Sequence, residues 1–372
     1  MCRNLLSNMG KVDIGFAEEC ESWRLQSRFF RSKIGGNPAW LNLKTLPKND
    51  QISCDYCKDP CIFLCQVYAP YEEDARAFHR TLYIFICKNP NCCKTNKAGN
   101  LKVVRSQLER LNEFYPSNPP EENKAWRTDI SVEKWTRICY VCGILSTSHC
   151  AKCKKVDYCC HLHQVFDWEN GHKESCGTEK EVDSKSIFFP EFELVIEPER
   201  KEKEAILEKY FQNKDIKKEI QEIKKYESLV TSGHAGTLIS EPNVDADLIQ
   251  MSNRIEDVTF FEFQEHIKND PDQVLRYDRG GFPLYISSIN QVEYIPKCEE
   301  CNSERQFEFQ IMPQLINYLD FEDPINSLDW GIIGIFTCKK SCVPKAGYVS
   351  EWIWKQDIVE NETVNICKSN TP

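Results

Sequence analysis

Long apolar runs are missing from this sequence of 372 residues. No stretch approaches the roughly 18–20 consecutive apolar residues that a helix needs to cross a bilayer, so we expect no membrane-spanning segment and no membrane partner. The first residues, MCRNLLSNMGKVDIGF, also lack an apolar stretch followed by a small-residue cleavage site, the pattern of a secretory signal. We therefore expect a soluble protein made in the cytosol.

Positive charge is also in deficit. Lys and Arg number 47 against 57 Asp and Glu, which gives a formal net charge of −10. A negative field repels the phosphate backbone of nucleic acids and attracts basic proteins. We therefore expect no direct DNA binding and favour a basic protein as the partner.

Signatures of common catalytic sites are absent as well. The sequence contains no phosphate-binding glycine loop, no Gly-x-Ser-x-Gly elbow, no His-Glu-x-x-His and no Asn-His-Ser-Cys-like segment of a lysine methyltransferase. His79 and Cys87 offer a Cys–His pair, but we interpret them as a structural histidine and a metal thiolate. We predict that the protein is not an enzyme, and a methyltransferase-type activity is the least favoured alternative.

Cysteine, in contrast, is abundant. There are 21 cysteines, an odd number that does not allow complete intrachain disulfide pairing, and many of them stand in Cys-x2-Cys pairs. Disulfides are rare in a reducing compartment, where this spacing indicates metal binding. We therefore interpret most of these cysteines as zinc ligands.

The densest cysteine segment runs from Cys139 to Cys176. Its candidate ligands form four pairs, enough for two tetrahedral zinc ions. The order of the pairs predicts cross-bracing, in which the first and third pairs share one ion and the second and fourth pairs share the other. The predicted sites are Cys139, Cys142, Cys159 and His163, and Cys150, Cys153, His172 and Cys176.

His161 competes with His163 as a ligand, but a Cys-x-His pair would be cramped, so we prefer His163 and interpret Cys160 as a bystander. Four ligands at each ion leave no open position for water, so catalysis at these ions is not expected. The segment resembles the MYND family of zinc fingers, and His163 stands where that family often has cysteine. The resemblance extends to Tyr158, Gln164, Trp168 and the His172-Lys173 pair. It implies a protein-binding module, often for short proline-containing peptides.

A repeated pattern brackets the finger. The segments GGNPAWL at 35–41 and GGFPLYI at 280–286 are each followed by a Cys-x2-Cys pair and by two apolar runs, the second of which ends in cysteine. Aromatic and β-branched residues in such runs are typical of strands. The repeat predicts one zinc site in each half: Cys54, Cys57, Cys87 and Cys92, and Cys298, Cys301, Cys338 and Cys342.

Two choices stay open in the first of these sites. Cys93 is almost as good a candidate as Cys92, and Cys61 or Cys65 could replace one of the ligands. Zinc binds cysteine as the thiolate, so four filled sites would bring the net charge to about −16.

Together these patterns predict a β-rich α+β fold, in which two pseudo-repeated, zinc-stapled antiparallel β domains carry an inserted MYND finger. We expect the first β domain at 11–120, the finger at 135–177 and the second β domain at 188–372, with a charged helical or flexible insert at about 200–256.

Two segments near the insert have their own patterns. Apolar residues recur every three or four positions from Lys203 to Tyr226, as in an amphipathic helix. The aromatic segment Phe189–Glu199 is expected to add a strand to the C-terminal domain.

A further resemblance extends over most of the chain, from about residue 12 to 358. The segments that carry it include VDIGFAE (12–18), SKIGGNPAWL (32–41), QVYAP (66–70), FHRTLYIFIC (78–87), FPEFELVIEPE (189–199), RYDRGG (276–281), FEFQIMPQLINYL (307–319), LDWGIIGIFTC (328–338), FTCKKSC (336–342) and WKQD (354–357). In these segments the chain is similar to the programmed cell death protein 2 family.

That resemblance implies a role in ribosome production. Members of the family are expected to be dedicated chaperones that bind one basic protein of the small ribosomal subunit as it is synthesised and escort it toward pre-40S assembly, in cytoplasm and nucleus. An acidic carrier suits a basic client, because electrostatic attraction speeds capture. The alternative is a transcriptional corepressor adaptor that uses the MYND finger to hold proline-rich peptides.

Overall fold

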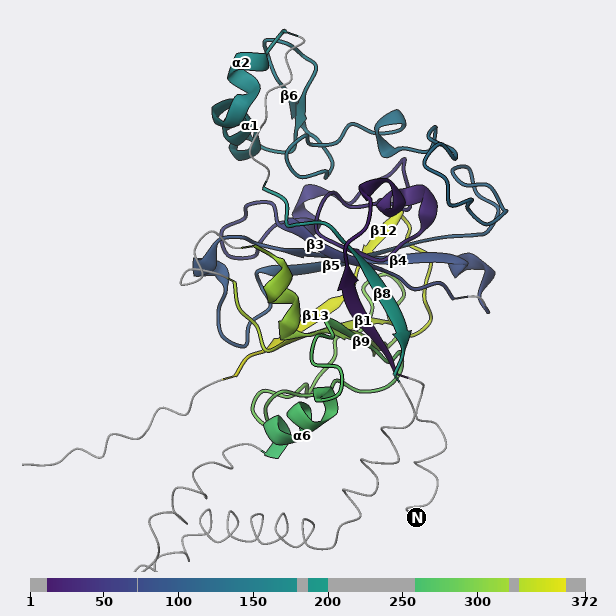
Figure 1. Ribbon diagram of the computed structural model, residues 1–372, viewed down its shortest axis with the longest axis vertical. Helices are drawn as coiled ribbons and strands as arrows, with labels where there is room; N and C mark the ends of the chain where they lie inside the picture. The colour runs from purple at the N-terminus through teal and green to yellow at the C-terminus, as the bar shows by residue number, and fades with distance from the viewer. Residues whose placement is uncertain (1–11, 72, 179–186, 200–257, 321–327, 359–372) are drawn as a thin grey trace, which may run out of the picture.

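The structure, a computed structural model, describes residues 12–71, 73–178, 187–199, 258–320 and 328–358 (Figure 1). The strands are β1 (Asp13–Glu18), β2 (Lys33–Ile34), β3 (Ile62–Tyr68), β4 (His79–Ile86), β5 (Leu101–Leu108), β6 (Ser148–His149), β7 (Asp157–Tyr158), β8 (Phe192–Pro198), β9 (Leu275–Tyr277), β10 (Arg305–Ile311), β11 (Ile332–Cys338), β12 (Tyr348–Ser350) and β13 (Trp352–Gln356). The α-helices are α1 (His161–Asp167), α2 (Lys173–Ser175) and α6 (Val258–Ile267).

Most of the strands belong to a single sheet. Eleven strands follow the order β12-β5-β4-β3-β2-β8-β1-β9-β10-β11-β13, and β6 and β7 form a separate pair in the finger. The pairings are antiparallel, which confirms the predicted β-rich fold class. The two predicted β repeats are joined through this sheet. We call β1–β5 the N-terminal half, and β8–β13 with α6 the C-terminal half.

The first strand of each half pairs with the other half. Strand β8 lies between β2 and β1, and β1 lies between β8 and β9. Lys33 of β2 is opposite Glu193 of β8, and Gly15 of β1 is opposite Leu275 of β9. Apart from β12, the strands follow the same order from either end of the sheet, with β8 and β1 exchanged between the halves at its centre, as in a pseudo-twofold arrangement.

This arrangement corrects one expectation. The segment Phe189–Glu199 does contain a strand, β8, but its neighbours are β1 and β2 of the N-terminal half rather than strands of the C-terminal half. The physical reason is that β2 offers an edge of unpaired backbone groups beside β3, and β8 satisfies them.

Backbone details of the two halves repeat at an offset of about 244 residues. The third strand of each half carries one register shift, at Phe63/Cys65 in β3 and at Phe307/Phe309 in β10. The glutamine that directly follows this shift holds the glycine-proline loop of its half. Gln66 accepts a hydrogen bond from the Ala39 amide (2.9 Å), and Gln310 accepts one from the Leu284 amide (2.7 Å). The internal repeat is thus visible in three dimensions.

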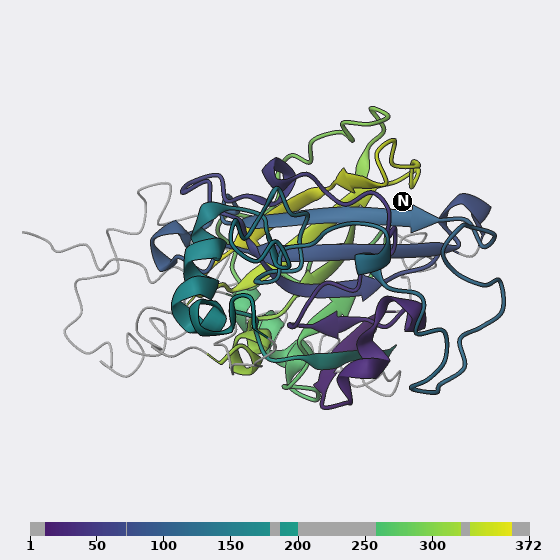
Figure 2. The same ribbon diagram turned by 90° about the horizontal axis from the view of Figure 1, so that it is seen from above.

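The sheet nearly closes on itself. Strands β12 and β13 are consecutive in the chain, yet β12 pairs with β5 at one end of the sheet and β13 pairs with β11 at the other. Glu351, between them, donates its amide to the carbonyl of Val103 in β5 (3.1 Å). Figures 1 and 2 show the strands of the C-terminal half crossing the direction of β3–β5, as expected when a twisted sheet approaches a barrel.

Strand β4 is buried along its whole length, which explains its run of aromatic and β-branched residues. On one face Tyr83 and Phe85 pack against Trp40, with ring centroids 4.9 and 6.0 Å apart. Successive side chains alternate between faces, so Arg80 lies on the other face, where it meets Glu308 of β10.

Arg80 and Glu308 form an ion pair between the two halves. Both side chains are fully buried, and Arg80 Nη2 lies 2.7 Å from Glu308 Oε2. Tyr277 donates its hydroxyl to the same carboxylate (3.0 Å), and Thr337 donates as well. Burial would raise the pKa of Glu308, but the Arg80 guanidinium outweighs this effect and lowers the pKa to about 2.

A second buried carboxylate joins the halves near the closure. Glu351 accepts hydrogen bonds from Arg105 of β5 (2.7 Å) and Arg305 of β10 (3.0 Å), and from the amide of Cys338 (3.1 Å). A buried carboxylate with three donors is well compensated for its loss of hydration. Two buried, hydrogen-bonded carboxylates therefore link the two halves.

The finger lies against the N-terminal half (Figure 1). The buried Trp40 indole donates to the carbonyl of Gly143 (2.8 Å), and Asn49 donates to the carbonyl of Cys159 (3.2 Å). One hydrophobic cluster contains residues of the finger and of both halves. The finger is thus packed onto the sheet.

Some sequence predictions cannot be compared with the structure. The amphipathic helix at Lys203–Tyr226 and the charged insert at about 200–256 lie outside the described residues. Within the described ranges, no helix is both long and apolar enough to span a bilayer.

Candidate metal centres

Four groups of cysteine and histidine side chains meet in the structure, and each contains the four residues of one predicted set. Within a group, all ligand atoms lie within 4.8 Å of one another. The groups are Cys54, Cys57, Cys87 and Cys92 (the N-terminal group); Cys139, Cys142, Cys159 and His163 (the first finger group); Cys150, Cys153, His172 and Cys176 (the second finger group); and Cys298, Cys301, Cys338 and Cys342 (the C-terminal group).

The spacing of these atoms fits a tetrahedral ion. A zinc ion about 2.3 Å from each thiolate requires sulfurs about 3.8 Å apart. Measured Sγ–Sγ distances are 3.6 Å for Cys57–Cys87, 3.6 Å for Cys142–Cys159, 3.8 Å for Cys150–Cys176, 3.6 Å for Cys298–Cys342 and 3.5 Å for Cys301–Cys338. Disulfide sulfurs lie about 2.05 Å apart, and the described cysteines are all free thiols. The donor sets therefore suit zinc better than disulfides.

All four Cys-x2-Cys segments share one backbone conformation, which we call the knuckle. In each, the amide of the residue after the second cysteine donates to the carbonyl of the first. That residue has a positive φ: Lys58 (66°, 3.0 Å), Gly143 (70°, 2.8 Å), Lys154 (58°, 2.9 Å) and Asn302 (57°, 2.8 Å). Left-handed backbone is uncommon outside glycine. Its recurrence at the same position of all four segments indicates that the turn itself requires this conformation. The turn brings amides toward sulfur, as for Lys155, whose amide lies 3.5 Å from Cys153 Sγ.

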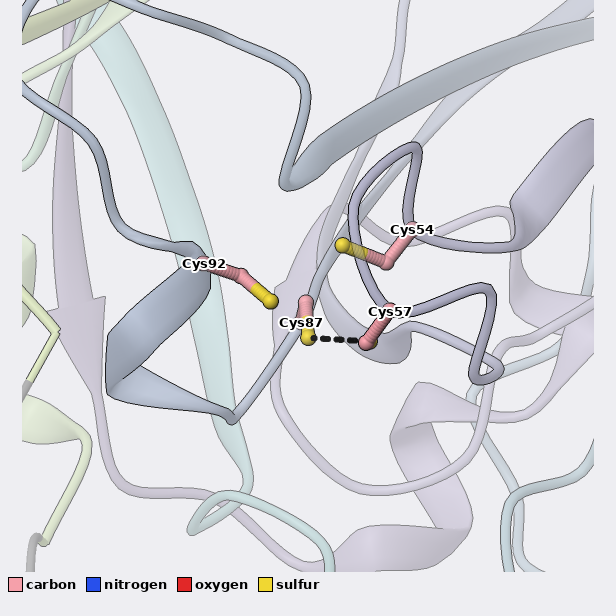
Figure 3. A group of neighbouring side chains, drawn as sticks. All are labelled: Cys54, Cys57, Cys87 and Cys92. Carbon is pink, nitrogen blue, oxygen red and sulfur yellow. Dashed lines mark hydrogen bonds between the residues drawn. The ribbon is translucent and has the colours of Figure 1, made fainter.

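The N-terminal group joins the loop before β3 to the segment after β4. Cys54 and Cys57 come from the knuckle, Cys87 directly follows β4, and Cys92 ends a short 3-10 turn (Pro90–Cys92). Figure 3 shows their side chains converging from these separate segments. Cys93 instead donates its thiol to the carbonyl of Asp329 (3.1 Å). The structure therefore places Cys92, and not Cys93, in the group.

Cys61 and Cys65, which also stood as candidate ligands in this half, are buried thiols outside the group. Burial raises the pKa of both thiols well above the ordinary range. Cys61 Sγ lies 3.8 Å from the carbonyl of Asn100, and Cys65 sits in β3. Both pack as small apolar residues in the core.

The C-terminal group is the most accessible of the four. Cys301 is exposed and Cys342 is half-buried, while Cys338 ends the buried strand β11. Arg105, from the N-terminal half, brings Nη2 to 3.8 Å from Cys342 Sγ. A guanidinium beside a ligating sulfur stabilises the thiolate. The sequence did not predict a role for Arg105, because arginine is not a metal ligand and has no characteristic spacing from the cysteines.

The two finger groups use opposite ring nitrogens of their histidines. His163 presents Nδ1, 3.1 Å from Cys159 Sγ, and His172 presents Nε2, 3.6 Å from Cys153 Sγ. His161 is exposed and Cys160 lies outside both groups, although its Sγ is 3.8 Å from that of Cys159. The choice of His163 over His161 thus agrees with the geometry.

In the second finger group, the surroundings of Cys150 favour its thiolate. Burial alone would raise the pKa of the Cys150 thiol, but hydrogen bonds from the Cys153 amide and from His172 outweigh it and lower the pKa to about 6. The thiolate is the form that binds metal. Tyr158, one of the residues shared with MYND fingers, donates to the buried Asp167 carboxylate (2.6 Å) and fixes α1 against β7.

His79 and Cys87, the conceivable Cys–His pair, are at opposite ends of β4. At about 3.3 Å per residue, the strand separates them by more than 20 Å. His79 stacks on Phe30 (4.2 Å) and its Nδ1 lies 3.1 Å from the Tyr68 hydroxyl. Burial, helped by the positive charge of Arg110, lowers the pKa of His79 to about 4, so it is neutral. It is placed as a structural residue.

Comparison with known proteins identifies the family. "Programmed cell death protein 2" of Mus musculus is 39% identical over 360 residues, which cover 94% of this chain and 98% of the relative. The chain belongs to the programmed cell death protein 2 family. Family models match the N-terminal domain of this family at residues 11–122, the MYND finger at 139–176 and the C-terminal domain of the family at 257–357.

More distant members of the family extend the comparison. "Programmed cell death protein 2-like" of Homo sapiens is 25% identical over 84% of this chain and 86% of its own length. "Probable 20S rRNA accumulation protein 4" of Schizosaccharomyces pombe is 25% identical over 86% of this chain and 91% of its own length. No solved structure matches the chain. The MYND match implies zinc in the finger, and the geometry shows two further groups able to hold a metal ion.

Proposed function

We propose that this protein binds a basic protein of the small ribosomal subunit during synthesis and escorts it toward pre-40S assembly. The observation that carries the proposal is membership of the programmed cell death protein 2 family over nearly the whole chain. That family includes a relative whose name concerns the accumulation of 20S rRNA, and the match to it covers 86% of this chain. The likeness therefore extends beyond the finger. Such an escort works in both cytoplasm and nucleus.

The charge of the protein supports a basic client. The formal net charge is −10, and thiolates in four filled metal groups would bring it to about −16. An acidic surface captures a basic chain quickly, because long-range attraction steers the encounter. The same charge disfavours a nucleic acid as the direct ligand.

The metal groups support a structural role. Each group supplies four ligand atoms, whereas catalytic zinc sites have three protein ligands and an open position for water. We infer that all four groups hold zinc and that the protein acts by binding rather than by catalysis. Transfer of labelled methyl groups to any partner would revive the methyltransferase alternative.

Affinity purification from translating cells tests the proposed function. The tagged full-length chain is expected to recover one small-subunit ribosomal protein at near-equal amounts, and nuclease treatment should not reduce the yield, because the contact is between proteins. Quantitative mass spectrometry of the eluate measures both proteins. Recovery of chromatin regulators alone would rule out the escort function in favour of the corepressor adaptor.

A second function, binding of proline-containing peptides by the finger, is favoured by its surface. Tyr140 and Leu162 are 58% and 55% exposed. A cavity of about 180 Å³ beside the second finger group is lined by Tyr140, Asp167 and His172 among others. An exposed aromatic side chain that lines a hollow suits short extended peptides. This is the surface a corepressor adaptor would use.

The two activities are expected to separate by mutation. Replacing Tyr140 and Leu162 by serine should weaken the binding of proline-rich peptides about tenfold or more, since exposed anchors dominate such contacts. Neither side chain is a metal ligand, so zinc content should stay unchanged. Capture of the ribosomal client should persist. If the double substitution abolishes client capture instead, the finger, rather than the sheet, holds the client.

A further inference from the structure

The finger docks on a specific segment of the N-terminal half. The indole of Trp40 donates to the carbonyl of Gly143 at the first knuckle of the finger (2.8 Å). Gly143 lies so close to this segment that an added Cβ would be 2.5 Å from Asn37 Oδ1 and 3.0 Å from Pro38 Cδ. The stretch from Asn37 to Trp40 is therefore a docking surface that the protein occupies with its own finger.

The C-terminal half has an equivalent segment, on which no finger lies among the described residues. Phe282, Pro283 and Tyr285 stand in the repeat where Asn37, Pro38 and Trp40 stand in the first half. The Gln66–Ala39 hydrogen bond recurs as Gln310–Leu284, so the backbone is held in the same way. Phe282 is 85% exposed, which is exceptional for a phenylalanine, a residue type that is usually buried.

Other exposed apolar side chains follow in the same loop. Tyr294 is 75% exposed and Ile289 is 48% exposed. Tyr285 packs edge-on against Trp354 of β13, with ring centroids 5.8 Å apart, which holds the start of this loop on the sheet. We call the exposed side chains of Phe282, Ile289 and Tyr294 the Phe282 surface.

The chain segment that carries the Phe282 surface has mostly acidic charged residues. The stretch 278–304 contains two basic residues, Arg279 and Lys297, and five acidic ones: Asp278, Glu293, Glu299, Glu300 and Glu304. Arg279 is engaged, with its guanidinium 4.3 Å from the ring centroid of Tyr71. Glu300 is paired with Lys345 (3.3 Å), while Glu293, Glu299 and Lys297 are exposed. The exposed carboxylates of Glu293 and Glu299, which we call the acidic rim, complement a basic partner.

We propose that the Phe282 surface is the docking site for the basic client, a proposal that rests on the escort function above. Exposed aromatic rings attract Lys and Arg side chains through cation–π contacts and supply the anchors that dominate binding energy. The acidic rim speeds association and selects basic chains. The finger occupies the equivalent surface of the N-terminal half, so the two-fold repeat leaves one surface for an internal module and one for a partner.

The test measures binding of purified basic small-subunit ribosomal proteins, one at a time, to the full-length chain. Phe282→Asn introduces the residue that the first half has at this position, and Leu111→Asn is a matched control, because Leu111 is 79% exposed in the N-terminal half. Against whichever protein the wild type binds, Phe282→Asn is expected to raise the Kd about tenfold or more and Leu111→Asn less than about twofold. Glu293→Gln and Glu299→Gln should lower the association rate, most strongly at low salt.

Zinc content and thermal stability are measured for each variant, so that a folding defect is not mistaken for a binding defect. A Phe282→Asn variant that binds as tightly as the wild type, or no more weakly than Leu111→Asn, overturns the docking site and leaves the escort function standing. If the wild type binds none of the ribosomal proteins, the escort function fails and the docking site fails with it.

Discussion

Replacing Cys338 by serine is expected to remove one zinc ion from each chain and to unfold the C-terminal half. Cys338 is fully buried at the end of β11, in the C-terminal group. Structural zinc contributes about 10–16 kcal/mol in small fingers, whereas a whole domain is stable by only about 5–15 kcal/mol. Loss of one ligand therefore removes most of the margin. Zinc per chain by elemental analysis and the thermal unfolding midpoint measure the effect.

Cys65→Ser is the matched control for this prediction. Cys65 is also buried, in the bulged strand β3, but belongs to no metal group. Its serine variant should cost about 1–3 kcal/mol for a buried hydroxyl and should keep all of its zinc. A wild-type content of four zinc ions per chain supports the duplicated scheme, while two would confine metal to the finger. A Cys338→Ser protein with undiminished zinc would contradict the assignment.

Removing Arg80 has the second largest expected effect. Arg80→Met leaves the Glu308 carboxylate buried without its ionic partner, which typically costs about 3–5 kcal/mol. The double variant Arg80→Met with Glu308→Met is expected to recover much of that loss, because two packed apolar side chains no longer bury a charge. Unfolding of zinc-loaded protein in denaturant measures the change in free energy.

The surface pair Arg127–Asp129 provides the comparison. Its Nη2–Oδ2 distance is 2.8 Å, similar to that of the buried pair, but both side chains are substantially exposed. Arg127→Met should therefore change the free energy of unfolding by at most about 1 kcal/mol. If the Arg80 and Arg127 variants lose equal amounts of unfolding free energy, the Arg80–Glu308 pair is solvated in solution.

The metal ligands were predictable because their signal is local. A Cys-x2-Cys pair is a single turn of chain, and the internal repeat supplied the more distant partners Cys87 and Cys338 by analogy between the halves. The choice between adjacent Cys92 and Cys93 was not predictable. It depends on which thiol the turn after Pro90 directs inward, and that is set by tertiary contacts such as the one to Asp329.

The joining of the halves was not predictable from local pattern. The composition of Phe192–Pro198 predicts a strand. The strands that pair with it, however, are decided by which sheet edges are open after the rest of the sheet forms. Arg80 and Glu308 look in sequence like solvent-facing residues of half-buried strands, because period-two alternation does not distinguish water from a polar interior. Their burial follows from the near closure of the sheet.

The exchange of β1 and β8 between the halves also determines when the strands of the sheet can pair during synthesis. Strand β1 is made first, yet its neighbours β8 and β9 begin roughly 175 and 255 residues after β1 ends. At about 5–20 residues per second, the N-terminal strand waits roughly 10–50 s for its last neighbour. Until β8 is made β2 has an open edge, until β9 is made β1 has one, and neither half can complete its sheet alone. The nascent chain is thus itself vulnerable to edge-to-edge aggregation for most of its own synthesis.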